Sequence, residues 1–130
     1  MALDQAAFTL SIVQGARLRV GFRYKVDDVA QPLDGYSFRG AIRAKEDISS
    51  LLLLDLTPHL AVDSGDATQL WLDVPASVTA ALDEKAMSRS GVAWDIFMWP
   101  GGDVDSAQLL IQGGVEFDAS ATDMRASSGG

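Results

Sequence analysis

Alternation of polar and apolar residues is the dominant pattern of this chain, and it predicts β-strands. The clearest example spans residues 17–26, where apolar side chains alternate with three arginines, a glycine and a lysine. A period of two places the apolar residues on one face of a strand, whereas a helix would spread them around its circumference. We therefore expect one ten-residue strand whose exposed basic face is formed by Arg17, Arg19, Arg23 and Lys25.

Similar patterns predict the remaining elements. Further strands are expected at residues 8–12, 36–43, 51–56, 60–62, 70–74 and 92–99, and a last one at 107–111 and 115–117. Gly113-Gly114 would form a bulge within that last strand. The turn-rich residues 27–35 are expected to form a loop. Pro75 suits the first position of a helix, and one or two helical turns are expected over 75–82.

About seven main strands at a spacing of roughly ten residues indicate an all-β fold. The architecture expected is an antiparallel β-sandwich of immunoglobulin-like layout with one short helical turn between the fifth and sixth strands. Residues 1–118 would form this domain. Residues 119–130 are small and polar, ending in Ser-Ser-Gly-Gly, and are expected to form a flexible C-terminal tail.

Composition narrows the range of functions. The chain of 130 residues is 48% hydrophobic and carries a formal net charge of −8, which disfavours nucleic acid and anionic membranes as partners. Zero cysteines exclude a disulfide scaffold, a cysteine nucleophile and thiolate zinc sites. The start of the sequence lacks the positive region of a signal peptide, and the longest strongly apolar run, residues 51–54, is far too short to span a membrane. We therefore expect folding in a cytoplasm.

Charge is distributed unevenly along the chain. Residues 1–50 carry seven basic and six acidic groups, a net of +1, whereas residues 51–130 carry three and twelve, a net of −9. This asymmetry permits surfaces of opposite charge, through which identical subunits could pair. A homo-oligomer or other symmetric assembly is therefore expected.

Few residues are candidates for chemistry. His59 is the one histidine, and the sequence supplies no identifiable nucleophile or second base for it. Asp63, Asp66, Asp103 and Asp105 lie in Gly-containing turns without the spacing of a calcium loop, and aspartates in turns bind their own backbone. The sequence therefore predicts no catalytic residue, no metal site and no cofactor, and an enzyme is the least favoured function.

Two tryptophans and two basic strands are the candidate interaction sites. The strand phases point Trp71 and Trp99 outward, where an indole can stack on a sugar or anchor a protein interface; the alternative is that each fills the core. A second basic face carries Arg39 and Arg43. These basic faces are either solvated surfaces balanced by nearby carboxylates or docking surfaces for an acidic partner.

Several segments, in this order, resemble a family of small bacteriophage virion proteins. They are Gln14-Gly15 with the strand at 17–26, the stretch from Pro32 to Tyr36 leading into residues 38–43, residues 70–72 with 76–82, Trp94-Asp95-Ile96, and residues 108–113 with Val115. The chain is similar over roughly residues 13–118 to the immunoglobulin-like sandwich at the N-terminus of upper-baseplate and tail-fibre adaptor proteins. In larger members this domain leads into a stalk or receptor-binding region, whereas here the sequence ends near the sandwich, which favours a stand-alone module.

The resemblance implies a structural protein of the virion. It would dock onto tail or baseplate proteins as an adaptor or minor tail protein, after folding in the host cytoplasm. Related sandwiches decorate phage heads, so a capsid decoration (cement) protein is one alternative, with capsid proteins as partners. A carbohydrate-binding module using Trp71 or Trp99 is another. The expected docking residues are Arg17, Arg19, Arg23, Lys25, Arg39, Arg43, Trp71 and Trp99.

Overall fold

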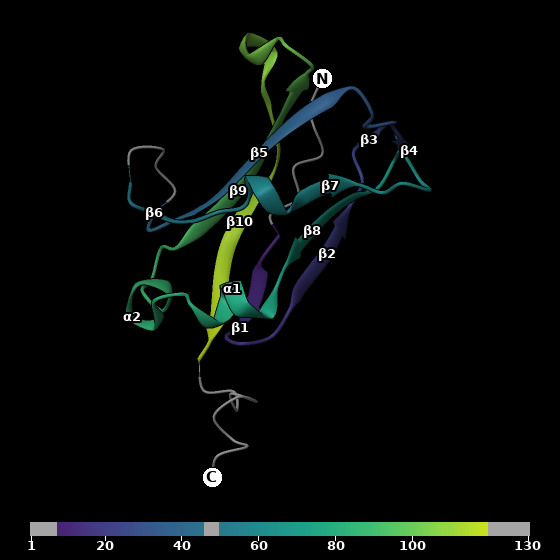
Figure 1. Cartoon of the computed structure of the whole chain (residues 1–130). Coiled ribbons are helices and arrows are strands. Elements are labelled where there is room, and N and C mark those ends of the chain that lie inside the picture. Colours follow the sequence, from purple (N-terminus) through teal and green to yellow (C-terminus); the bar gives the residue numbers. More distant parts are fainter. Residues whose placement is uncertain (1–7, 46–49, 120–130) are drawn as a thin grey trace.

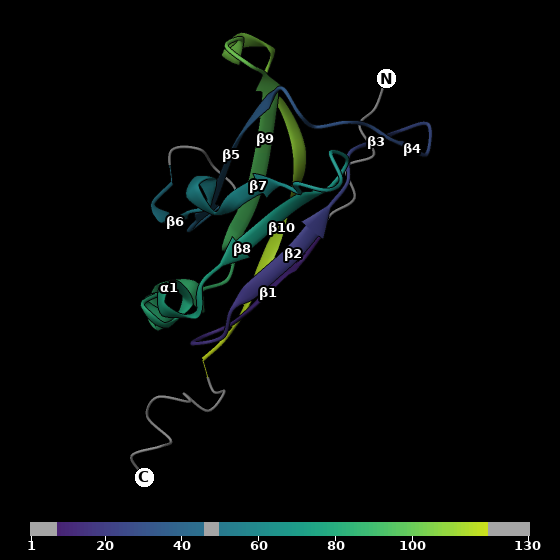
Figure 2. The same ribbon diagram turned by 45° about the vertical axis from the view of Figure 1, so that its right-hand side comes forward.

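The chain folds into two layers of β-strands (Figures 1 and 2). A computed structural model describes residues 8–45 and 50–119. The larger sheet has the order β1 (Leu10–Val13), β10 (Gln108–Asp118), β9 (Ala93–Pro100), β5 (Tyr36–Arg43) and β6 (Leu52–Asp55). The smaller sheet has the order β2 (Leu18–Phe22), β8 (Leu70–Val74) and β7 (Leu60–Val62), and its strands run obliquely to β9 and β10.

This strand order confirms the predicted immunoglobulin-like sandwich. Strands β2, β8 and β7 make one layer, while β10, β9 and β5 make the other and β6 extends it, as in the variable type of that fold. The pairing departs from the prediction in one respect, because β1 runs parallel to β10, with Leu10 opposite Val115. The other strand pairs are antiparallel.

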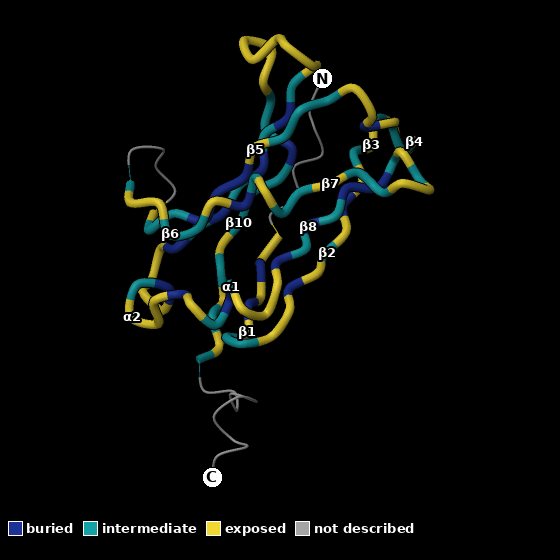
Figure 3. Tube along the Cα trace, viewed as in Figure 1, coloured by how far each residue is buried: buried dark blue, intermediate teal, exposed yellow. Residues whose placement is uncertain are grey.

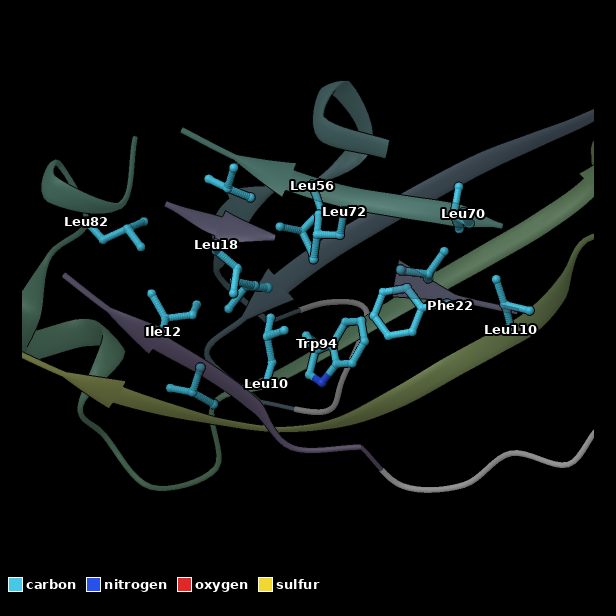
Figure 4. Close-up of a cluster of buried hydrophobic side chains, with 14 of the residues drawn as sticks. Leu10, Ile12, Leu18, Phe22, Leu56, Leu70, Leu72, Leu82, Trp94 and Leu110 are labelled. Atoms are coloured by element: carbon cyan, nitrogen blue, oxygen red, sulfur yellow. The ribbon is translucent and has the colours of Figure 1, made fainter. Parts of the chain in front are cut away.

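Alternation along the strands explains the core. In β9, Trp94, Ile96 and Met98 are at most 2% exposed, while the residues between them are half-buried on the outer face. Leucines of β8 meet them from the opposite sheet, and Figure 4 shows Trp94 between Leu10 and Phe22. The Trp94 indole nitrogen donates a hydrogen bond to the carbonyl of Phe8 at 2.8 Å, which satisfies its polar group inside the core.

The predicted ten-residue strand at 17–26 is wrong in its second half. Strand β2 ends at Phe22, and the chain continues into a separate hairpin of β3 (Lys25–Val26) and β4 (Val29–Ala30). Asp27 and Asp28 form its turn with φ of 52° and 64°. Positive φ at both central residues fits the twist of a two-residue hairpin loop, and aspartate tolerates it better than most residues. Part of the expected loop at 27–35 is therefore strand.

Strand β10 also differs from its prediction. It runs unbroken from Gln108 to Asp118, and its irregularity lies at Leu110, not at Gly113-Gly114. Gly113 has a different role, because a Cβ at this position would collide with the backbone of Phe8. Gly113 thus permits the segment before β1 to approach β10 closely.

Two short helices, not one, connect β8 to β9. Helix α1 (Ala76–Ala80) starts after Pro75, which is its N-cap instead of its first residue, and α2 (Glu84–Met87) was not predicted. The buried hydroxyl of Thr79 donates to the carbonyl of Ala16 at 2.8 Å and accepts from the amide of Gly15 at 3.1 Å. These bonds tie the helices to the turn between β1 and β2, at the end of the sandwich opposite the β9–β10 connection (Figure 1).

The β9–β10 connection carries a short 3₁₀ helix, η2 (Val104–Ser106), and residues 101–107 are exposed, as the yellow tube in Figure 3 shows. A second 3₁₀ helix, η1 (Thr57–His59), joins β6 to β7. The expected C-terminal tail lies outside the described residues from position 120 onward.

Candidate interaction faces

The structure divides the predicted site residues between opposite outer faces of the sandwich. We call the outer side of β2, β8 and β7 the small-sheet face, and the outer side of β10, β9, β5 and β6 the large-sheet face. The small-sheet face holds Arg17, Arg19, Arg23 and Trp71, and the large-sheet face holds Arg39, Arg43 and Trp99. Lys25 lies in the separate β3–β4 hairpin. Both tryptophans alternate with buried neighbours, as the strand phases predicted.

The arginines of the small-sheet face are bound by carboxylates of β8 and of the turn that precedes it. Arg17 makes a two-pronged pair with Asp73, with nitrogen–oxygen distances of 2.8 and 2.6 Å. Arg23 bonds Asp66 at 2.8 Å. The register of β2 and β8 places Arg19 directly opposite Asp73, and its guanidinium lies 3.7 Å from that carboxylate. The solvated, self-balanced alternative therefore describes these cations.

Trp71 is held by the same network. Its indole nitrogen donates to Asp63 at 3.0 Å, and the guanidinium carbon of Arg19 lies 3.7 Å from the centre of its ring. A cation over an indole is attracted to the negative face of the ring. One face of this tryptophan is thus already covered.

Protonation of the small-sheet carboxylates reflects these contacts. The Thr68 hydroxyl, then Arg23 and the Thr68 amide, lower the pKa of Asp66 to about 2, because each hydrogen bond favours the ionised form. The hydrogen bond from Arg17 is the main cause of a lowered pKa at Asp73. Both carboxylates are therefore charged at neutral pH and remain available to the arginines.

The large-sheet face is hollowed and largely apolar. A cavity of about 350 Å³ opens on it. The apolar lining comes from Phe97 and Trp99 of β9, Ala41 of β5, and Val104 and Ala107 of the β9–β10 connection. Val104 is 61% exposed. Alanine beside two large rings leaves the space that a bulkier side chain would fill.

Polar groups line the hollow on both sides of the rings. Arg43 approaches Asp95 at 3.6 Å, with its side chain only 14% exposed. Burial raises the pKa of Asp95, and this effect outweighs the opposing influence of Arg43 and Arg39. Arg39 is exposed and makes no ion pair within residues 8–45 and 50–119. Gln112 of β10 completes the lining.

Part of this hollow was not predicted from the sequence. The alternation that buries Trp94 and Ile96 also places Asp95 and Phe97 on the outer face, so these two residues could have been predicted. Val104 and Ala107 belong to an irregular connection, for which no periodicity gives a direction.

A second hollow, of about 420 Å³, lies between the two sheets beside Phe22 and Leu110. Arg23 and Lys25 are the charged residues of its lining. Phe8, 41% exposed, forms part of its wall.

Two of the turn aspartates bind neighbouring backbone amides, as predicted. Asp63 accepts from the amide of Gly65 at 2.9 Å, and Asp66 accepts from the amide of Thr68 at 3.0 Å. Asp103 accepts instead from the side-chain hydroxyl of Ser106 at 2.7 Å. His59 ends η1 and is half-buried. In the part of the chain that the structure describes, no three His, Cys, Asp or Glu residues are grouped as metal ligands would be. Nor does that part contain a helix long and apolar enough to cross a membrane.

Comparison with known proteins gives a distant structural neighbour. No family model matches the chain, and no curated protein matches it. Among solved structures, a chain of the ZIG-8–RIG-5 IG1–IG1 heterodimer is similar with a TM-score of 0.38 and 11% identity, covering 89% of this chain and 84% of the other. The fold assignment above rests on the strand order itself.

Proposed function

We propose that this protein is a structural component of a bacteriophage virion that assembles by surface complementarity with other virion proteins. The sequence segments that resemble phage adaptor sandwiches motivate the class of protein. The single observation that supports a docking role is the large-sheet face, where Trp99, Phe97 and Arg39 line a hollow on the sheet. Trp and Arg are the residues most enriched among energetically dominant interface contacts.

Among the predicted docking residues, the structure favours those of the large-sheet face. Arg17 and Arg23 already have carboxylate partners, so a new partner would have to compete with Asp73 and Asp66. Arg39 has no such competitor among the described residues, and its charge remains available to an acidic partner. A position in the tail or baseplate is the leading assignment, and capsid decoration is the alternative.

Particle incorporation tests this proposal. A phage lacking the gene would be complemented with the wild type or with Arg39→Glu/Trp99→Ala, and the copy number per purified particle measured by quantitative mass spectrometry. We expect that variant to lose most of its occupancy. Arg19→Glu/Arg23→Glu, which changes the small-sheet face instead, is the matched control and should be incorporated normally. Normal occupancy of the large-sheet variant would refute the docking role of this face, and absence of the wild type from particles would refute the proposed function.

A second candidate function is carbohydrate binding through Trp99. An aromatic ring beside Asp95, Gln112 and Arg39 offers both a stacking surface and hydrogen-bonding groups, which a sugar ring requires. Trp71 is less suited, because Arg19 already stacks on it. Glycan-array binding that Trp99→Ala abolishes and Trp71→Ala preserves would support this function, and silence of the wild type on the array would dismiss it.

A further inference from the structure

The hollow of about 420 Å³ beside Phe22 and Leu110, which we call the edge hollow, has a predominantly apolar wall. Phe8 and Ile111 complete that wall, and Figure 4 shows Phe22 and Leu110 at the same end of the core. The rings of Phe8 and Phe22 meet edge to face with their centroids 5.8 Å apart, yet Phe8 remains 41% exposed. Pockets that hold small molecules have volumes of roughly 300–1,000 Å³ and walls of this kind. The edge hollow therefore has the size and the apolar surface that a small ligand requires.

The charged residues of the edge hollow are both cations. Arg23 is already paired with Asp66 at 2.8 Å. Lys25 is exposed and forms no ion pair with any residue in 8–45 or 50–119. None of the described lining residues is acidic. A hollow lined by charge of one sign attracts the opposite charge, so the ligand that suits this site is an anion held mainly by Lys25.

A buried amide supplies one further polar group. Gln69 is only 9% exposed, and its Nε2 donates to the carbonyls of Phe22 and Leu70, both at 3.3 Å. A Cβ at Gly21 would collide with this nitrogen, so glycine leaves the space that the amide occupies. The Oε1 of Gln69 accepts no hydrogen bond from the described part of the chain. Every fully buried side-chain nitrogen or oxygen in that part has a partner, so this oxygen is accessible and can accept from a ligand.

We infer that the edge hollow binds a small aromatic carboxylate that carries a hydroxyl group. Its carboxylate lies at Lys25, its ring packs against the exposed ring of Phe8, and its hydroxyl donates to Oε1 of Gln69. An apolar body with a few convergent polar contacts is the usual basis of orientation and specificity in such sites. The edge hollow is separate from the large-sheet face, so this inference does not depend on the proposed function.

NMR titration of the isotope-labelled full chain with para-hydroxyphenylacetate tests the inference. We expect saturable shifts at the backbone amides of Phe22 and Leu110 and at the side-chain amide of Gln69, with a dissociation constant in the millimolar range. Two comparison ligands each lack one polar group. Phenylacetate has no hydroxyl and para-cresol has no carboxylate, and each should bind roughly fivefold more weakly.

Two variants separate the polar contacts. Lys25→Gln should weaken para-hydroxyphenylacetate binding roughly fivefold and leave para-cresol binding unchanged. Its matched control is Lys85→Gln, the same change in helix α2 at the other end of the sandwich (Figure 1), which should bind as the wild type does. Gln69→Met should abolish the preference for para-hydroxyphenylacetate over phenylacetate. Circular dichroism verifies that the variants are folded.

Three results would overturn the inference. The first is a wild type whose shifts do not saturate by about 10 mM ligand. The second is saturable binding at the large-sheet face instead of the edge hollow. The third is a wild type that binds the three ligands equally well, a comparison that stands even where Gln69→Met does not fold. Absence of the wild type from particles would refute the proposed function and leave this site unaffected.

Discussion

The two outer faces of this sandwich are built from similar residues but differ in what those residues contact. Each face carries arginines on one strand and an outward tryptophan on its neighbour. On the small-sheet face, Arg19 covers Trp71 and Asp73 binds Arg17. On the large-sheet face, Trp99 has no ring or guanidinium stacked on it among the described residues, and Arg39 forms no ion pair with any of them.

Strand register accounts for the difference. In the small sheet, Arg19 of β2 lies directly opposite Asp73 of β8, and cross-strand neighbours on one face are close enough to pair. In the large sheet, Arg39 lies opposite Phe97, so its nearest cross-strand neighbour offers no charge. Composition alone therefore does not distinguish a surface whose charges are paired internally from one that is available for binding. The distinction depends on which residues lie opposite each other on neighbouring strands.

The largest expected effect comes from the core that both faces share. Trp94 is 2% exposed and contacts Phe22 at a ring-centroid distance of 5.5 Å. Trp94→Ala should lower the free energy of unfolding by about 3–5 kcal/mol, because it removes a large buried ring and leaves a cavity. Urea unfolding followed by circular dichroism measures this. A loss below about 1 kcal/mol would contradict the placement of Trp94 at the centre of the sandwich.

A smaller effect separates the two outward tryptophans. Trp71→Ala removes a cation–π contact and a hydrogen bond to Asp63, while Trp99→Ala removes neither. We therefore expect Trp71→Ala to cost about 1 kcal/mol more in unfolding free energy than Trp99→Ala. The measurement requires protein dilute enough to be monomeric, since association would stabilise the folded state by mass action. Equal losses would mean that the contacts of Trp71 contribute nothing measurable.

Much of this comparison could be predicted from the sequence. The two-residue period of β9 and β8 gave the buried sets and the outward direction of both tryptophans, because one buried face imposes a strict register. The number and spacing of strands was enough for the two-layer fold. The predicted backbone role of aspartates in turns is confirmed at Asp63 and Asp66.

The contacts between strands could not be predicted. Alternation continues through Arg23 and Lys25, so nothing in the pattern marks the end of β2, and the turn at Asp27-Asp28 depends on a backbone conformation that periodicity does not report. Which carboxylate lies opposite which arginine depends on strand pairing, a non-local property. For that reason the sequence could not assign the basic residues to different faces of the sandwich, whereas the structure does.

The smallest expected effects concern the pH dependence of the unfolding free energy, to which one carboxylate on each face contributes. Asp66, on the small-sheet face, has a folded pKa of about 2, lowered from its ordinary value of 3.8. A lowered pKa means that the folded state releases its proton more readily than the unfolded state. Its stabilising contribution is therefore complete above about pH 4 and is lost as the pH falls toward 2. The unfolding free energy of Asp66→Asn, measured beside the wild type, should converge with the wild-type value over that window.

Asp95, on the large-sheet face, should behave in the opposite way. Its folded pKa is raised above 3.8 by burial, so the folded state holds its proton more tightly than the unfolded state does. The stability that this group contributes is present at low pH and is lost as the pH rises through the folded pKa. Asp95→Asn, which cannot ionise, should thus gain stability relative to the wild type as the pH rises above 3.8. Carboxyl NMR titrations of both aspartates give the direct measurement. A midpoint for Asp95 below that of Asp66 would contradict the opposite environments assigned to the two carboxylates.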